Sequence, residues 1–166
     1  MEERSKTLSS SASTRISLDA VRNKHAGLTQ KRERILSKVS NSNDWASFKR
    51  DAISIKDLAY LAAKTGDEFA LLRGKTNDIV FHGVKYHCHI EGELLDLLKT
   101  KNLRLIAHTH PDYGEIYPSN DDRNFLKYIR QKTSKIISSI TGVEQIFSAN
   151  PFDDIWEGGK SNADNK

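Results

Sequence analysis

Two histidines follow a short apolar run, in an arrangement that suits a metal ion. The run covers residues 103–107, and His108, Thr109 and His110 come directly after it. Alternate side chains of a β-strand lie on one face, so both imidazoles should point the same way while the threonine points to the opposite face. Catalytic zinc is commonly held by three protein ligands and keeps a fourth position for water. Asp122, at the start of the next expected helix, is the candidate third ligand.

Ser119 and Asp122 also have a purely structural explanation. A serine followed three positions later by an acid is typical of a capping box, in which the serine oxygen accepts a backbone N–H and the acid reaches back. Pro118 and the loop before it should bring this helix start toward the histidines, which favours a ligand role. The two roles are compatible, and Asp121 remains the competing ligand.

The combination of His108-Thr-His110-Pro with Ser119-x-x-Asp122 resembles the signature of the JAMM (MPN-type) zinc metallopeptidases. The resemblance implies a prokaryotic-type JAB domain with Zn²⁺ as cofactor and His108, His110 and Asp122 as metal ligands. It also implies an upstream glutamate that acts as general acid/base, and the matching residue is Glu68. Ser119 would, by the same resemblance, donate a hydrogen bond to the oxyanion of the tetrahedral intermediate.

The reaction that this resemblance implies is hydrolysis of a peptide or isopeptide bond by a metal-activated water. The relatives include deubiquitinating isopeptidases and small prokaryotic enzymes that process ubiquitin-like or sulfur-carrier proteins. We therefore expect a protein substrate, with ubiquitin-like conjugates and precursors as candidates. The alternative is a non-catalytic MPN-type assembly or interaction module, for example in a toxin or phage protein. Such modules lack the metal residues, whereas all of the candidates are present in this chain.

The resemblance spans roughly residues 55–148 and departs from the family pattern in one loop. The eight residues from Pro111 to Pro118 are one more than the family usually has between the second histidine and the serine. This extra residue leaves the choice between Asp121 and Asp122 as ligand open.

Other chemical sites have less support. His87, Cys88 and His89 offer two imidazoles and a soft thiolate, which zinc accepts, but the cysteine should point away from its neighbours on a strand. The chain contains no His-Glu-x-x-His pattern and no phosphate-binding Gly-x-x-x-x-Gly-Lys-Ser/Thr loop. Its single cysteine also excludes the Pro-Cys-x-x-Cys half of the zinc-deaminase pattern.

Charge divides the chain into a basic first part and a slightly acidic remainder. The net charge is +4, and residues 1–50 hold eleven Lys and Arg against five Asp and Glu, whereas the remaining residues hold fifteen against seventeen. We expect a basic, largely flexible arm or linker at 1–44, the JAMM/MPN-like domain at 45–156 and a disordered tail at 157–166. The arm has no aromatic residue before Trp45, which favours a solvated arm over nucleic-acid binding.

The sequence also bears on the compartment. Cys88, the one cysteine, cannot form an internal disulfide, and neither a signal peptide nor an apolar span of about 20 residues is present. We therefore expect a soluble, cytoplasmic protein without a membrane partner.

The hydrophobic pattern predicts an α/β fold, which the resemblance narrows to an MPN/JAB-like one with a mixed central sheet flanked by helices. Ser54 and Asp57 have the spacing of a capping box, and Gly66 is placed to end the helix that they begin. Further helices are predicted at residues 28–38, 92–100 and 119–132, and strands at residues 68–73, 79–82, 84–90, 103–108, 135–141 and 143–148.

Overall fold

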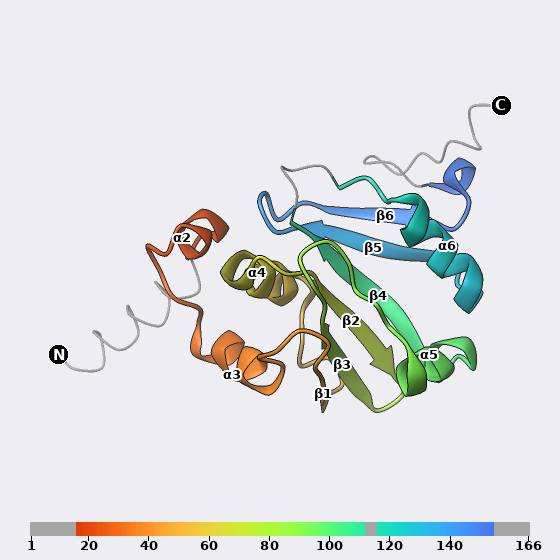
Figure 1. Ribbon diagram of the computed structural model, residues 1–166, viewed down its shortest axis with the longest axis horizontal. Coiled ribbons are helices and arrows are strands. Elements are labelled where there is room, and N and C mark those ends of the chain that lie inside the picture. Colours follow the sequence, from red (N-terminus) through yellow and green to blue (C-terminus); the bar gives the residue numbers. More distant parts are fainter. Residues whose placement is uncertain (1–15, 112–115, 155–166) are drawn as a thin grey trace.

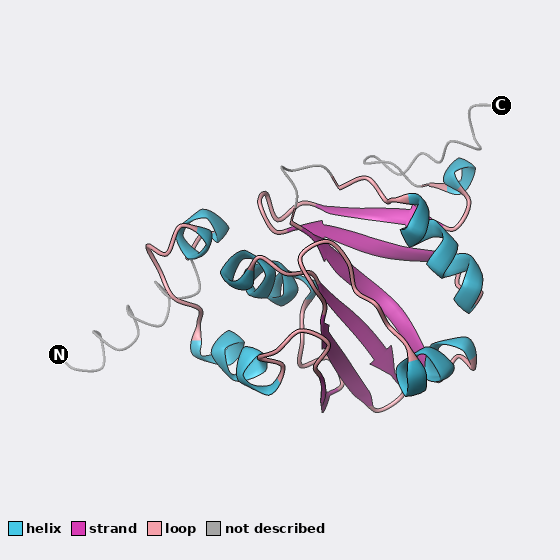
Figure 2. Cartoon of the chain, in the orientation of Figure 1, coloured by secondary structure: helices cyan, strands magenta, loops and turns pink. Residues whose placement is uncertain are grey.

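The structure is a computed structural model that describes residues 16–111 and 116–154 of the 166-residue chain. The helices are α2 (Leu18–Arg22), α3 (Gln30–Lys38), α4 (Ile55–Thr65), α5 (Gly92–Lys99) and α6 (Asn120–Ile129), and a short 3-10 helix, η1, covers Pro151–Asp153. The strands are β1 (Trp45–Lys49), β2 (Phe69–Gly74), β3 (Asn77–His82), β4 (Leu103–His110), β5 (Thr133–Ser138) and β6 (Glu144–Ser148). Figures 1 and 2 show these strands side by side, with helices around them.

The six strands form one mixed sheet in the order β1-β3-β2-β4-β5-β6. Neighbouring strands run antiparallel, except for the parallel pair β4 and β5. Parallel neighbours need a crossover connection, commonly a helix, and here the connection contains α6. The chain therefore leaves the C-terminal end of β4 and enters α6 before it returns to the sheet, which links the two parts of the expected metal site.

Helices cover both faces of the sheet, and each face has its own apolar cluster. On one face α4 buries Leu58 and Leu61 against the sheet, with α3 beside it. On the other face α5 and α6 bury Leu98 and Leu126. A mixed sheet flanked by helices, within the α/β class, is thus confirmed.

Local sequence accounts for both ends of α4. Ser54 and Asp57 form a complete capping box, in which each side chain accepts from the other residue's backbone N–H. The helix ends at Gly66, whose φ of 80° lies in the left-handed region that favours glycine. Both predictions for this helix are confirmed. Its C-terminal end delivers the chain to Glu68, one residue before β2 begins.

The expectation of a largely flexible arm up to residue 44 is wrong for residues 16–44. Leu18 and Val21 of α2 are buried against α4, and Ile35 and Val39, in and just after α3, are buried in the cluster beneath α4. These helices are short, so one or two apolar side chains each suffice to dock them, and the sparse pattern was too weak to show an apolar face. Residues 1–15 lie outside the described part of the chain.

Packing therefore does not begin at residue 45, where the domain boundary was expected. Trp45, the first residue of the expected domain, opens β1, an edge strand that pairs with β3 and alternates exposed and half-buried residues. The start of the expected tail at residue 157 lies outside the described residues.

The strand expected at residues 84–90 is also wrong. This segment contains one isolated bridge, between Val84 and His87, and no strand. The alternation of polar and apolar residues that suggested a strand belongs to a folded-back segment, in which Ile90 is buried while Tyr86 is 65% exposed. The segment is held against the start of β2, because the Glu68 N–H donates to the Val84 carbonyl and the Gly83 N–H donates to the Glu68 carbonyl.

No helix among the described residues is both long enough and apolar enough to cross a membrane.

Candidate metal centre

Strand β4 places both histidines at its C-terminal end and on one face. Thr109, between them, points to the opposite face, where its buried hydroxyl accepts a hydrogen bond from the Phe69 N–H at 3.0 Å. The strand is held on both sides, since His108 lies opposite Ala70 of β2 and opposite Ile136 of β5. The alternation predicted from the sequence is confirmed at these three positions.

The start of α6 fixes the third member of the site. Ser119 is the N-cap, and its hydroxyl oxygen accepts from the Asp122 N–H at 3.0 Å. The Asp122 carboxylate reaches back and accepts from the Ser119 N–H at 2.8 Å. The capping-box explanation is therefore correct, and it also limits the orientation of the carboxylate that faces the histidines.

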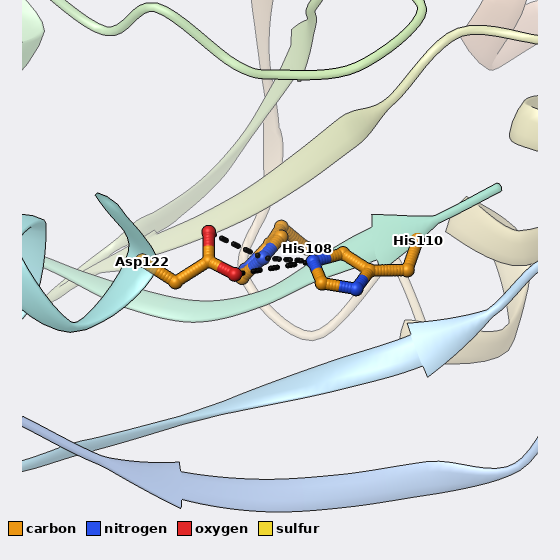
Figure 3. Close-up of side chains that lie close together, drawn as sticks. All are labelled: His108, His110 and Asp122. Atoms are coloured by element: carbon orange, nitrogen blue, oxygen red, sulfur yellow. Dashed lines mark hydrogen bonds and ion pairs between the residues drawn. The ribbon is translucent and has the colours of Figure 1, made fainter. Parts of the chain in front are cut away.

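The three side chains converge on one point (Figure 3). His108 Nε2 and His110 Nε2 lie 3.2 Å apart. Asp122 Oδ1 lies 3.2 Å from His108 Nε2, and Asp122 Oδ2 lies 3.2 Å from His110 Nε2. Among the described residues, these three form the only group of three or more His, Cys, Asp or Glu whose donor atoms are close enough together to hold a metal ion.

This spacing fits zinc. Ligand atoms at about 2.0–2.2 Å from a tetrahedral zinc ion lie about 3.3–3.6 Å from one another, and nitrogen and carboxylate oxygen are donors that zinc accepts. The three separations in the site, each 3.2 Å, are close to that range. Three such ligands fill one side of a tetrahedron and leave the fourth position open.

Electrostatics keep the Asp122 carboxylate ionised. Burial acts to raise the pKa of Asp122, but the hydrogen bonds of His108 and His110, the charge of His108 and the Ser119 N–H outweigh burial and hold this pKa well below its usual range. An ionised carboxylate beside two imidazole nitrogens is the form that binds a cation. The two imidazoles must be neutral to bind a metal ion, so a bound ion would take the place of any proton that His108 and His110 share with this carboxylate.

Glu68 lies at the edge of the same site. It is 6% exposed, and it lines two cavities together with Asp122, one of which His108 also lines and the other His110. Its backbone is fixed by the hydrogen bonds to residues 83 and 84. Glu68 therefore borders the space in front of the three donor atoms without being one of the three.

Its neighbour Asp67 has a separate, structural role that the sequence did not reveal. The Asp67 carboxylate lies 2.8 Å from Nε2 of His82, whose Nδ1 lies 2.6 Å from the Val39 carbonyl oxygen. The His82 ring also stacks on Phe69, with centroids 4.3 Å apart. This partly buried network anchors the residue just before Glu68 and pairs its carboxylate with His82.

The competing sites expected from the sequence are not assembled in the same way. His87, Cys88 and His89 do not form a metal-sized group among the described residues, and His89 instead lies 3.1 Å from Glu91. Burial, together with the charges of Glu68 and Asp122, raises the pKa of the Cys88 thiol, which opposes the thiolate form needed for zinc. Asp121 is exposed and lines the cavities, whereas Asp122 meets both histidines.

The sequence also missed the residues that wall the site. Tyr86, Phe125 and Phe147 line the larger cavity beside the metal ligands. Phe147 comes from β6, and its ring meets the His108 ring edge-on, with centroids 5.7 Å apart. Nothing in their local pattern distinguishes them from ordinary core or surface aromatics. Only the folded sheet brings Phe147 against His108, because β6 lies two strands away from β4 in the sheet order.

Comparisons with known proteins identify no relative of this chain. The chain matches no protein-family model, no curated protein and no solved structure.

Proposed function

We propose that this chain is a zinc-dependent hydrolase that cleaves a peptide or isopeptide bond. The observation that carries the proposal is the convergence of His108, His110 and Asp122: the two Nε2 atoms lie 3.2 Å apart, and each lies 3.2 Å from one of the two carboxylate oxygens. A zinc ion held there supplies Lewis acidity, which lowers the pKa of a coordinated water to about 7 and so provides a nucleophile at neutral pH.

Glu68 is the general acid/base of the proposed reaction. It borders the space in front of the donor atoms, within the same cavities. In this role its carboxylate accepts the proton of the attacking water and later delivers the proton to the leaving amine. Its nearly complete burial supports the role, because exclusion of bulk water strengthens electrostatic interactions inside a site.

Ser119 has a donor that remains available for the reaction. Its hydroxyl oxygen accepts from the Asp122 N–H, and a hydroxyl that accepts a hydrogen bond can still donate its own hydrogen. The residue lines the smaller cavity next to His110 and Glu68. We assign Ser119 the stabilisation of the oxyanion that forms on the substrate carbonyl, where a single such donor is typically worth about 3 kcal/mol.

The JAMM (MPN-type) resemblance supports a protein substrate, of the ubiquitin-like class. The segments that join the strands are short, from two residues between β2 and β3 to twenty-two between β4 and β5, which include α6. Such connections leave little room for large substrate-gripping insertions. The small prokaryotic JAB-type enzymes are therefore the relatives whose activity we propose for this chain.

The experiment that tests the proposal combines metal loading with hydrolysis. Full-length protein is loaded with zinc and incubated with C-terminal fusions of ubiquitin-like proteins and with isopeptide-linked conjugates, with and without phenanthroline. Hydrolysis that phenanthroline abolishes and zinc restores is the expected result. The contradicting result is a zinc-loaded protein that cleaves nothing but binds a partner stoichiometrically, while its Glu68→Gln variant binds that partner equally well. This result would favour a non-catalytic assembly module over a hydrolase.

A further inference from the structure

We propose that the cavity beside the metal centre receives a bulky apolar side chain of the substrate, from a residue that flanks the scissile bond. This inference rests on the proposed hydrolase function, because it places a peptide across the metal centre. It adds a substrate preference that the ligand residues alone do not imply.

Two adjoining cavities share the walls of the metal centre. The larger has a volume of about 610 Å³ and the smaller about 270 Å³, and we call them the inner and the outer cavity. Glu68, Tyr86, His87, Asp121 and Asp122 line both. A peptide that lies over the metal centre therefore has access to both cavities at once.

The inner cavity has an apolar wall that starts at a metal ligand. His108 lines this cavity, and its ring packs edge-on against Phe147. The cavity opens into the apolar cluster beneath α5 and α6. Its apolar wall consists of Ala70, Ile90, Leu105, Phe125 and Phe147. An apolar surface next to a reaction centre gains binding free energy when an apolar group covers it.

The outer cavity has a different character. Its other lining residues are His110, Tyr117 and Ser119, and each carries a hydrogen-bonding group. Such a surface suits the polar backbone of a peptide and the developing oxyanion. We therefore assign the outer cavity to the backbone of the substrate peptide and the inner cavity to one of its side chains.

Size and charge narrow the class of side chain. The inner cavity, at about 610 Å³, lies within the range of about 300–1,000 Å³ that is typical of ligand pockets, so it has room for a bulky side chain. Among the described residues no Lys or Arg lines either cavity, whereas Glu68, Asp121 and Asp122 line both. No basic side chain among these lining residues would compensate the charge of Asp or Glu, and the apolar wall favours Leu, Met or Phe.

Peptide hydrolysis tests this preference. A fluorogenic peptide series is compared in which the residues on either side of the scissile bond are varied in turn among Gly, Leu, Phe and Asp. We expect the zinc-loaded protein to show a kcat/KM at least about tenfold higher with Leu or Phe than with Gly at one of the two positions, as apolar pockets commonly provide. Equal rates for Gly and Leu at both positions would overturn the inference.

A pair of variants on one helix localises the preference. Phe125→Ala removes an inner-cavity wall residue, while Tyr128→Ala changes another aromatic residue of α6 that is 58% exposed and does not line the cavity. We expect Phe125→Ala to lower the Leu-to-Gly selectivity ratio about tenfold and Tyr128→Ala to leave this ratio unchanged. An unchanged ratio in a folded Phe125→Ala protein would place the preference elsewhere and overturn the assignment.

Ligand binding separates this inference from the hydrolase proposal. Calorimetry on the zinc-loaded protein compares acetohydroxamate with a hydroxamate that carries a benzyl group. Tighter binding of the benzyl compound, reduced in Phe125→Ala, supports the inner cavity even if no peptide is cleaved, in which case only the hydrolase proposal fails. Hydrolysis without any side-chain preference, together with equal binding of both hydroxamates, leaves the hydrolase standing and removes the apolar subsite.

Discussion

Leu105 and His108 lie on the same side of β4, although an odd number of positions separates them. Leu105 belongs to the cluster beneath α5 and α6, and His108 lines the inner cavity within that cluster. The register with β2 explains this: Leu71 lies opposite Ala107 and the next residue of β2 lies opposite Leu105, so that Ile106 is an extra residue in β4. Such β-bulges re-aim side chains next to functional sites.

The bulge decides which helix the histidines meet. Strict alternation from Leu105 would turn His108 and His110 toward the face that α4 covers. With the extra residue, they turn toward α6, where Asp122 waits at the first turn. The metal site therefore depends on a backbone irregularity as well as on the ligand residues.

The first prediction separates the two neighbouring acids. Asp122→Asn should weaken zinc binding strongly, because Asp122 meets both histidines, whereas Asp121→Asn should leave zinc affinity nearly unchanged, because Asp121 is exposed. Both substitutions remove one negative charge from the first turn of α6, which makes them a matched pair. Competition with a fluorescent zinc chelator measures the affinities. The reverse order would mean that the eight-residue loop shifts the ligand by one position.

The second prediction concerns the proposed general acid/base. Glu68→Gln should keep the zinc content and the melting temperature and should lower kcat by about 10²- to 10⁴-fold, because an amide cannot accept the proton of the attacking water. The matched control is Asp67→Asn, which changes the neighbouring acid that is paired with His82. That control should lower the melting temperature and leave kcat nearly unchanged. Normal hydrolysis by Glu68→Gln would remove Glu68 from the mechanism.

Only those parts of the fold and the site that depend on local signals could be predicted from the sequence. His108 and His110 could be paired because alternation in a strand is local, and the ends of α4 could be placed because Ser54 and Gly66 carry their own signals. The bulge at Ile106 has no such signal, since it arises from how β4 pairs with a strand more than thirty residues earlier. The inner-cavity wall likewise depends on distant elements.

The packing of residues 16–44 could not be predicted from the sequence either. The helices of this segment carry few apolar residues, and their stabilising contacts are made with α4 rather than within the segment. Lys31 and Arg32 of α3 hold the buried Asp57, at 2.7 and 2.9 Å. From the sequence, these two residues contributed only to an excess of positive charge, because the partner carboxylate lies 25 positions or more further along the chain.

The third prediction tests whether this segment belongs to the core. Ile35→Ala should lower the free energy of unfolding by about 2–4 kcal/mol, because it leaves a cavity in a buried cluster. Arg34→Ala on the same helix is the control and should change it by less than about 0.5 kcal/mol, because Arg34 is exposed. Urea unfolding measures both. Equal, small effects would restore the segment to a loosely attached arm.

The fourth prediction is a pH dependence at Asp57. Burial acts to raise its pKa, but hydrogen bonds from Lys31, the Ser54 N–H and Arg32 outweigh burial and hold the pKa lower in the folded protein. A carboxyl whose pKa is depressed by folding stabilises the fold at pH values above its pKa in the unfolded chain, which is about 3.9. This stabilisation is lost as the pH falls through its pKa in the folded protein.

Asp57→Asn should therefore be less stable than the wild type by about 1.5–3 kcal/mol at pH 7, the range for hydrogen bonds to a charged group. The difference between the two proteins should shrink as the pH falls below about 4. Urea unfolding of both proteins from pH 7 to pH 3 measures the difference. A gap that stays constant over this range would show that the charge of Asp57 does not stabilise the fold.

The most direct test of the central claim is the metal content of the full-length protein, measured by elemental analysis for zinc, iron, manganese and nickel, because two histidines and one carboxylate can also hold non-haem iron. We predict about one zinc ion per chain, lost in His108→Ala/His110→Ala and retained in His87→Ala/His89→Ala, with similar melting temperatures when both variants are measured without metal. Undiminished zinc in His108→Ala/His110→Ala would contradict the assignment of these residues as ligands.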